Sequence, residues 1–139
     1  MPDPFDLHRF VAAQAPVIDR VRDELKNGRK TSHWMWFVFP QIAGLGFSSM
    51  SQRFAISSRN EARAYFEHAV LGPRLVECVE LVLAVEGLSA HDIFGSPNDR
   101  KFHSSLTLFG EVSEDDVFRR AIEKYFGGRL DEATLRRLP

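Results

Sequence analysis

The sequence predicts an all-α protein: a single compact domain over residues 1–139, with about six to seven helices, several of them short, around one central buried helix. Three observations lead to this prediction. Apolar residues recur at helical spacing in several segments. Ser, Asp, Pro and Gly residues stand where helices begin and end. No two segments of alternating polarity are joined by a tight turn, so a β-hairpin is not predicted.

The first helical segment extends from the N-terminus to Gly28. Asp3 is a typical N-cap, and Pro4 suits the first helical position. Pro16 interrupts the apolar pattern, which resumes at helical spacing over 17–25. The segment is therefore expected to be one helix or a kinked pair, and Gly28 stops it.

Residues 30–41 are the most unusual stretch, because they include both tryptophans and two of the twelve phenylalanines. Ser32 can cap a helical turn that begins at His33, and Pro40 ends that turn because its ring blocks continuation of the helix. We favour a short helix here. A buried strand over 36–39 is the competing interpretation, because aromatic and β-branched residues favour strands.

The middle of the chain contains the predicted central helix. Two glycines and three serines indicate that 42–51 is a loop, or a loop with one helical turn. Ser58 and Glu61 form a capping-box pattern at the start of a helix over about 59–68. Residues 75–85 are apolar on nearly every side, which is typical of a buried helix at the centre of a bundle.

The C-terminal third continues the helical pattern. Ser89 caps a short turn, and Pro97 stands near the first position of the helix that follows. The acidic stretch 113–116 suits the positive end of the next helix dipole. Asp131 is expected to cap a last turn.

Composition narrows the class of protein. The formal net charge is −1 and the pI is about 6.5, which argues against broad nucleic-acid binding because that binding needs a basic face. Cys78 cannot form an internal disulfide and lies in an apolar helical run, so we expect a buried, inert thiol. No signal pattern and no membrane-length apolar run is found, so we expect a cytoplasmic protein that does not enter the membrane.

The sequence contains none of the sharp catalytic or cofactor motifs. There is no phosphate loop, GxGxxG, His-Glu-x-x-His, paired-cysteine or GxSxG pattern. The histidines are scattered, without the spacing of metal ligands. No cofactor and no metal is therefore predicted.

Polar residues inside two apolar stretches point to a candidate site. Burying such groups costs about 1–3 kcal/mol unless they are satisfied, so they tend to meet one another or a ligand. We therefore predict a pocket between 30–41 and 99–105 for a small molecule such as a nucleotide or another phosphate-containing ligand. The ligand-binding candidates are Lys30, Ser32, Trp36, Gln41, Asp99, Lys101 and Ser104, and the catalytic candidates are His33 and His103.

Each candidate has a chemical role and a structural alternative. Imidazole titrates near neutrality, so either histidine could act as acid or base, while Lys30 or Lys101 would hold an anion. Ser32 could instead be only a helix cap. The two tryptophans could be core anchors, with at most one lining a cavity. Whether the domain is an enzyme is left open.

A second hypothesis needs no chemistry. The chain could be a non-catalytic protein-interaction domain, for example a homodimer, with an exposed apolar face formed by Phe47, Met50 and Phe54. An enclosed polar cavity would favour ligand binding, whereas a flat apolar patch of several hundred Å² would favour interaction.

Several blocks of the sequence resemble one uncharacterised bacterial family. They are 32–46, 69–75, 93–99 and 101–109, and the first, SHWMWFVFPQIAGLG, is the most specific. Together they resemble the family called domain of unknown function 1810, whose members are sometimes labelled calpastatin without an evident physical basis. The resemblance covers nearly the whole chain. It implies a mostly helical cytoplasmic domain, and it implies no activity.

Overall fold

The computed structural model describes residues 2–138, and these residues form ten helices and no strand. The all-α prediction is therefore confirmed, but the predicted number of six to seven helices is wrong. The helices are α1 His8–Gln14, α2 Ile18–Lys26, α3 Met35–Val38, α4 Ser49–Arg53, α5 Arg59–Glu67, α6 Leu71–Leu83, α7 Ala90–Phe94, α8 Asn98–Val112, α9 Val117–Phe126 and α10 Glu132–Arg137.

The helices outnumber the prediction because several are only one turn long. Helices α3, α4 and α7 have four, five and five residues. Pro40 follows closely on α3, Ser48 caps α4, and α7 lies between the cap Ser89 and Gly95. Pro16 separates α1 from α2, as expected for a kinked pair. Local stop signals thus divide the chain into pieces that only tertiary packing can stabilise.

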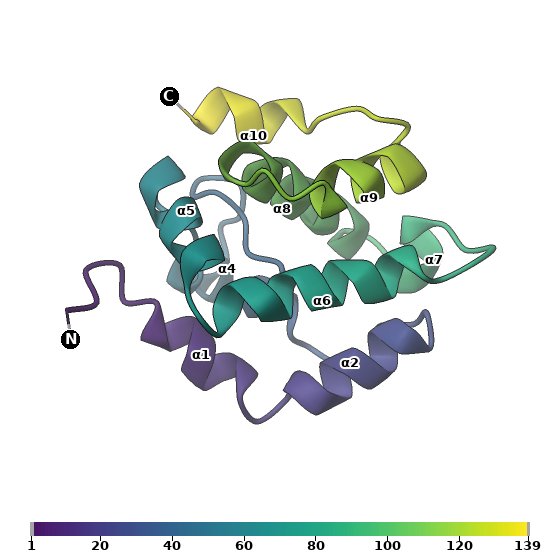
Figure 1. Ribbon diagram of the computed structural model, residues 1–139, viewed down its shortest axis with the longest axis horizontal. Coiled ribbons are helices and arrows are strands. Elements are labelled where there is room, and N and C mark those ends of the chain that lie inside the picture. The colour runs from purple at the N-terminus through teal and green to yellow at the C-terminus, as the bar shows by residue number, and fades with distance from the viewer. Residues whose placement is uncertain (1, 139) are drawn as a thin grey trace.

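The predicted single central helix is not found in the described part of the chain. Helix α6 packs against α2, α5 and α9, while α8 packs against α5, α7, α9 and α10 (Figure 1). One face of α6 is buried, but Glu77 and Glu80 hold its other face in water. Helix α8 is longer and is buried continuously over 104–109. The core is therefore shared between two long helices.

Aromatic rings connect the short helix α3 to α7 and α8. The ring of Phe39, just after α3, meets the rings of Phe102 at 5.0 Å and Phe94 at 5.9 Å, both edge to face. Phe94 and Phe102 stack on each other at 4.6 Å. Such pairs add about 0.5–1.5 kcal/mol beyond the burial of their area. The three rings hold the segment 35–41 against the N-terminal half of α8.

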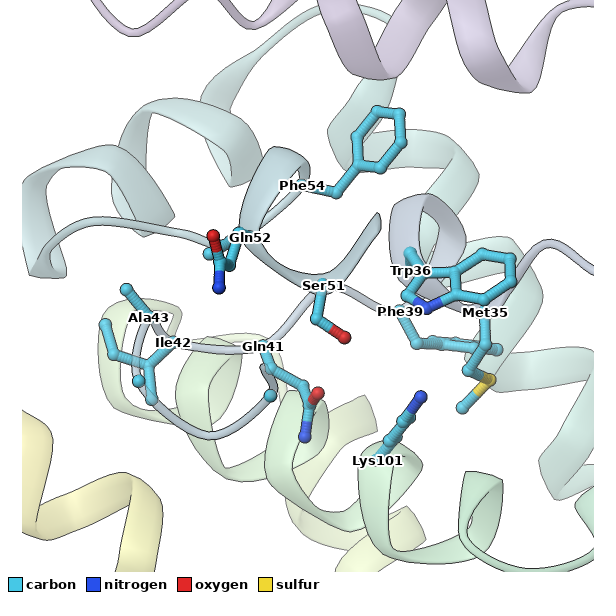
Figure 2. A pocket seen from close by; sticks show the side chains of 13 residues that line it. Met35, Trp36, Phe39, Gln41, Ile42, Ala43, Ser51, Gln52, Phe54 and Lys101 are labelled. Atoms are coloured by element: carbon cyan, nitrogen blue, oxygen red, sulfur yellow. The ribbon is translucent and has the colours of Figure 1, made fainter. Parts of the chain in front are cut away.

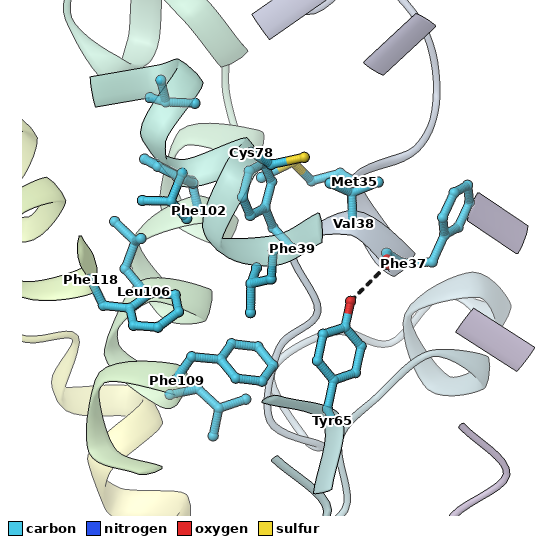
Figure 3. Close-up of a cluster of buried hydrophobic side chains, with 14 of the residues drawn as sticks. Met35, Phe37, Val38, Phe39, Tyr65, Cys78, Phe102, Leu106, Phe109 and Phe118 are labelled. Carbon is cyan, nitrogen blue, oxygen red and sulfur yellow. Dashed lines mark hydrogen bonds between the residues drawn. The ribbon is translucent and has the colours of Figure 1, made fainter. Parts of the chain in front are cut away.

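Buried polar side chains donate hydrogen bonds to the backbone carbonyl of Phe37, near the C-terminal end of α3 (Figure 3). The Phe37 carbonyl accepts hydrogen bonds from Gln14 Nε2 at 2.7 Å and from the Tyr65 hydroxyl at 3.4 Å. Gln14 Nε2 also donates to the Tyr65 oxygen at 3.0 Å. Burial raises the pKa of Tyr65, so this hydroxyl stays neutral and keeps its proton for the carbonyl. Burial likewise raises the pKa of Cys78 to about 12, which confirms a buried thiol.

An isolated bridge fixes the loop that follows α3. Ile56 donates its N–H to the Gln41 carbonyl, and Ala43 donates its own to the Ile56 carbonyl, both at 2.8 Å. The bridge closes residues 43–55 into a loop that contains α4. The two ends of this loop lie side by side, so 41–46 and 50–55 form two walls of one hollow.

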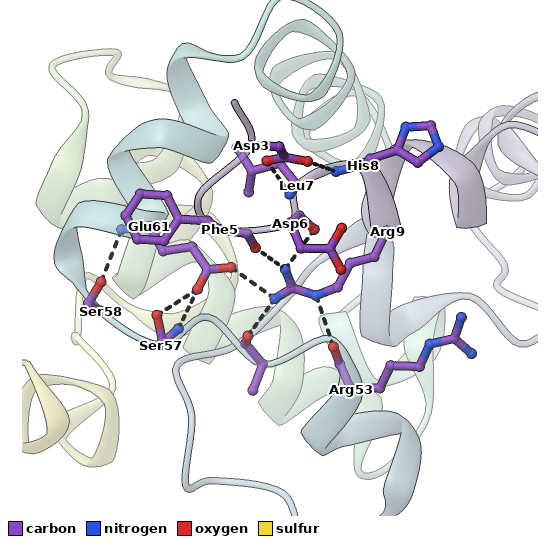
Figure 4. A network of polar contacts seen from close by, with 11 residues as sticks. Asp3, Phe5, Asp6, Leu7, His8, Arg9, Arg53, Ser57, Ser58 and Glu61 are labelled. Atoms are coloured by element: carbon purple, nitrogen blue, oxygen red, sulfur yellow. Dashed lines mark hydrogen bonds and ion pairs between the residues drawn. The ribbon is translucent and has the colours of Figure 1, made fainter. Parts of the chain in front are cut away.

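Arg9 fastens that loop to the N-terminal helix (Figure 4). Its guanidinium donates to the carbonyls of Arg53 and Ala55 at 2.9 Å each, and to those of Phe5 and Asp6. The same group forms an ion pair of 2.8 Å with Glu61, whose side chain is only 4% exposed. Every N–H of the guanidinium is engaged, and Glu61 also accepts from the N–H and hydroxyl of Ser57.

Replacing Arg9 by Lys should lower the free energy of unfolding by about 2–4 kcal/mol, because one ammonium cannot reproduce the forked contacts and leaves Glu61 poorly paired. Urea denaturation at neutral pH measures this. Arg22→Lys is the matched control, because Arg22 forms partly exposed ion pairs and should change stability by less than about 1 kcal/mol. Equal losses in both variants would contradict a special role for Arg9.

Candidate functional site

A small hollow lies where the 35–55 segment meets α8. Its volume is about 150 Å³. Ligand pockets for drug-sized molecules occupy roughly 300–1,000 Å³, so this hollow suits one small chemical group. The lining residues are Met35, Trp36, Phe39, Gln41, Ile42, Ala43, Gly44, Gly46, Ser51, Gln52, Phe54, Ala55 and Lys101 (Figure 2).

Core packing explains why Trp36 and Lys101 face each other. Phe39 contacts Phe102, which is the residue after Lys101 on α8. That contact brings the outer face of α3 over the first turns of α8. As a result the Lys101 ammonium lies 5.7 Å from the centre of the Trp36 ring, within the range of a cation–π contact. The segments 30–41 and 99–105 therefore meet in space.

The polar groups in the hollow are almost all donors or amides without an internal partner. No ion pair or hydrogen bond is found within residues 2–138 for the Lys101 ammonium, the Gln41 side-chain amide or the Trp36 indole N–H. The Ser51 hydroxyl accepts from Ser48 at 2.9 Å, which leaves its own hydrogen free to donate. In Figure 2 the ends of Gln41, Ser51 and Lys101 point into the same opening. None of the lining residues in the described chain is an acid.

Lys30 lies beside this hollow and outside its lining. Its ammonium donates to the Ser32 carbonyl at 2.5 Å and lies 5.0 Å from the centre of the Trp34 ring. Burial lowers the pKa of Lys30, Glu24 opposes that change, and the charge of Lys101 lowers it further. The Lys30 ammonium is therefore held within the chain and is not among the groups that line the hollow.

Ser32 and Trp34 belong to a buried carboxylate clip formed by Glu24. Glu24 accepts hydrogen bonds from the Thr31 N–H at 2.7 Å, the Ser32 N–H at 3.0 Å, the Ser32 hydroxyl at 2.5 Å and the Trp34 indole N–H at 3.0 Å. Burial alone would raise the pKa of Glu24, but these hydrogen bonds outweigh it and lower that pKa to about 2. The clip orients the chain as it enters α3.

His33 and Asp99 do not line the hollow. His33 is exposed, just before α3, and makes no side-chain hydrogen bond within the described chain. Asp99 is half-buried in the first turn of α8, where it accepts from the Arg100 N–H at 2.9 Å and lies 3.4 Å from His91. Acid–base catalysis by His33 stays a prediction.

His103 and Ser104 point toward the C-terminal helices. The His103 ring stacks on Phe126 at 4.0 Å, and its Nε2 lies 2.6 Å from the Arg129 carbonyl. Ser104 donates to the Arg100 carbonyl and lies 2.9 Å from an Asp131 oxygen. These contacts give both side chains a structural partner. Catalysis by His103 also stays a prediction.

The three residues proposed as an apolar interaction face lie at different depths. Phe47 is 85% exposed, at the tip of the loop, while Phe54 is 2% exposed and packs against Phe10 and Phe37. Met50 is half-buried. Phe47 is therefore the one member of this set that solvent fully reaches.

Other kinds of site were looked for among the described residues. No group of three or more His, Cys, Asp or Glu side chains within residues 2–138 is placed to hold a metal ion. None of the helices in that range combines the length and apolarity needed to cross a bilayer.

Ser51 and Gln52 line the hollow, and no sequence pattern marks them as candidate site residues. They lie on α4, where Ser51 ends the stretch 42–51 predicted as a loop with at most one helical turn, and Gln52 follows it. Only the bridge between Ile42 and Ile56 brings them opposite Gln41. Serine in a glycine-rich loop carries no signal of that contact.

The chain matches known proteins over nearly its whole length. A sequence model of the family described as "Protein of unknown function (DUF1810)" matches residues 4–138. The crystal structure of the conserved hypothetical protein Rv1873 from Mycobacterium tuberculosis, at 1.38 Å, is 52% identical and has a TM-score of 0.96, with 98% of each chain covered. No curated protein matches the chain.

The Glu24 clip predicts an acid-dependent loss of stability. The pKa is 4.5 for a free Glu and about 2 when folded, so ionised Glu24 stabilises the fold by about 3 kcal/mol above about pH 5. That contribution is lost as the pH falls through the folded pKa. Glu24→Gln should be less stable at pH 7 and should lose less further stability between about pH 5 and pH 2.

Urea denaturation across this pH range measures the effect. Glu77→Gln is the control, because Glu77 is exposed and pairs only with Arg22; it should change stability by less than about 1 kcal/mol. Parallel pH profiles for wild type and Glu24→Gln would show that Glu24 does not stabilise the fold in this way.

Proposed function

The chain belongs to the DUF1810 family of proteins of unknown function, and from this premise we propose that it binds a small phosphate-bearing molecule in the hollow beside Lys101. The phosphoryl group occupies the space between Trp36, Gln41, Ser51 and Lys101. The rest of the ligand lies outside, along the loop that carries Gly44 and Gly46. This proposal is for binding, and it assigns no reaction.

One observation carries the proposal: the ammonium of Lys101 lies in a hollow that has no acid in its described lining. A cation–π contact with Trp36 contributes only about 0.5–1 kcal/mol at such a site and leaves the N–H donors of the ammonium unused. An anion would accept hydrogen bonds from Lys101, and the Trp36 indole and Ser51 hydroxyl can donate as well. Charge-assisted hydrogen bonds of this kind are about twice as strong as neutral ones.

The size of the hollow supports a phosphoryl group as the part that enters. A volume of about 150 Å³ accommodates a tetrahedral anion with some water, and a whole nucleotide would exceed it. The half-buried face of Trp36 offers a flat surface at the mouth for a planar ring. A nucleotide phosphate is therefore one member of the proposed ligand class.

The predicted site residues take different parts in this proposal. Trp36, Gln41 and Lys101 contact the ligand. Lys30 lies outside the lining of the hollow, where its ammonium donates to the Ser32 carbonyl, and it is assigned no contact with the ligand. Ser32 acts through the Glu24 clip. Asp99 and Ser104 support the fold of α8.

Isothermal titration calorimetry with inorganic phosphate tests the proposal. Wild type should bind phosphate, and Lys101→Gln should weaken that binding about tenfold to a hundredfold, as expected for the loss of a charge-assisted hydrogen bond. Lys26→Gln is the matched control, because this substitution removes the same charge at a position that is exposed on α2, outside the hollow. His33→Ala should also bind as wild type, because His33 is not among the lining residues.

The affinity should fall with added salt, because the contact is electrostatic. Equal weakening by Lys101→Gln and Lys26→Gln would indicate a general charge effect and would contradict a site in the hollow. Absence of any phosphate binding to wild type would overturn the proposal.

A second candidate function, self-association, is favoured by the exposure of Phe47. A large aromatic ring that is 85% exposed at a loop tip is a typical anchor for a protein interface. Sedimentation velocity should then show a concentration-dependent dimer for wild type and a monomer for Phe47→Ser. Leu130→Ser is the control, because Leu130 is exposed elsewhere, between α9 and α10. A monomer at all concentrations of wild type would exclude this candidate.

A further inference from the structure

A second cationic group lies on the other side of the loop that lines the hollow. Arg137, at the end of α10, borders a wider surface hollow of about 440 Å³. Ile42 and Ala43 line both this hollow and the one beside Lys101. The two hollows are therefore neighbours, separated by one stretch of backbone.

Gly44 lies between Arg137 and the hollow beside Lys101. Gly44 lines the hollow beside Lys101, and the guanidinium of Arg137 packs directly on it. A β-carbon placed on Gly44 would lie 2.7 Å from Arg137 Cζ and 3.0 Å from Nε, so the end of the Arg137 side chain would have to move. Gly44 also has a φ of +97°, which favours glycine. The Gly44 backbone, which carries no side chain, therefore lies between the Arg137 guanidinium and the hollow beside Lys101.

The charge of Arg137 is not neutralised inside the described chain. Arg137 makes no ion pair or side-chain hydrogen bond within residues 2–138, whereas its neighbour Arg136 lies 3.4 Å from Glu132. Ser57, which also borders this hollow, donates its hydroxyl to Glu61. No acid is found among the described residues that line the second hollow. Arg137 is therefore available to an anion, and its planar fork suits a phosphoryl group.

We propose that Lys101 and Arg137 form two subsites for one diphosphate. One phosphoryl group lies beside Lys101, the other lies against Arg137, and the bridging oxygen lies between them. The missing side chain at Gly44 lets the Arg137 guanidinium lie directly against this backbone, next to the hollow beside Lys101. This inference rests on the proposed function, because it extends the same site to a second phosphoryl group. The ligand class is then a free diphosphate or a nucleoside diphosphate.

Calorimetric titration with phosphate, pyrophosphate and ADP tests this inference on the full chain. Wild type should bind pyrophosphate at least about tenfold more tightly than phosphate, because a second charge-assisted contact forms. Arg137→Gln should weaken pyrophosphate binding about five- to tenfold and leave phosphate binding unchanged. Lys101→Gln should weaken both.

Arg20→Gln is the matched control, because it removes an arginine charge at an exposed position on α2 that lines neither hollow. It should leave all three affinities near those of wild type. Arg137 is exposed, so thermal unfolding of Arg137→Gln should match wild type and confirm that the variant is folded. Tighter binding of ADP than of pyrophosphate would assign the nucleoside diphosphate as the source, and the reverse would assign the free diphosphate.

The outcomes separate the two proposals. If phosphate binds at Lys101 but Arg137→Gln and Arg20→Gln have equal effects on pyrophosphate, the second subsite is overturned and the first stands. If wild type binds neither phosphate nor pyrophosphate, both are overturned.

Discussion

The contact of Phe39 with Phe102 is the constraint on which the rest of the arrangement depends. It joins a four-residue helix, too short to be stable alone, to the longest helix of the described chain. Phe94 completes the cluster, so the segment after α3 is held from two directions. The position of Lys101 opposite Trp36 follows from this packing, because each lies within three residues of a ring in the cluster. The chemistry of the hollow is thus a consequence of the core.

Buried polar clips hold the irregular parts of the chain that hydrophobic packing does not fix. Glu24 gathers the turn before α3, Gln14 satisfies the carbonyl left free by α3, and Arg9 binds the carbonyls at the end of α4. Each clip joins a side chain on a regular helix to backbone groups of a loop. Loop backbone buried without such partners would cost about 1–3 kcal/mol per group. These hydrogen bonds therefore hold in place the loop segments that form the walls of the hollow.

Local signals in the sequence predicted the helices well and the irregular contacts poorly. Ser58 and Ser89 cap their helices as predicted, because capping depends on residues three positions apart. The predicted capping box at Ser58 is incomplete, because the Glu61 carboxylate accepts from the Ser57 N–H instead. The first helix does not begin at Pro4; Asp3 instead accepts from N–H groups four and five residues later, and α1 starts at His8. Glu24 was missed, although it stands three residues after Val21 on the apolar face of its helix. The meeting of the two polar segments was predicted, but the clips and the facing walls depend on contacts between distant residues, which periodicity does not encode.

The two tryptophans occupy opposite environments only two residues apart. Trp34 is 1% exposed and its indole N–H is bound to Glu24, whereas Trp36 is half-buried at the mouth of the hollow beside Lys101. Their intrinsic fluorescence therefore carries two separate signals. Emission from Trp34 reports the integrity of the fold, and emission from Trp36 responds to whatever occupies the mouth. Two single Trp→Phe variants would give this protein a built-in pair of optical probes, one for unfolding and one for occupancy, without any added label.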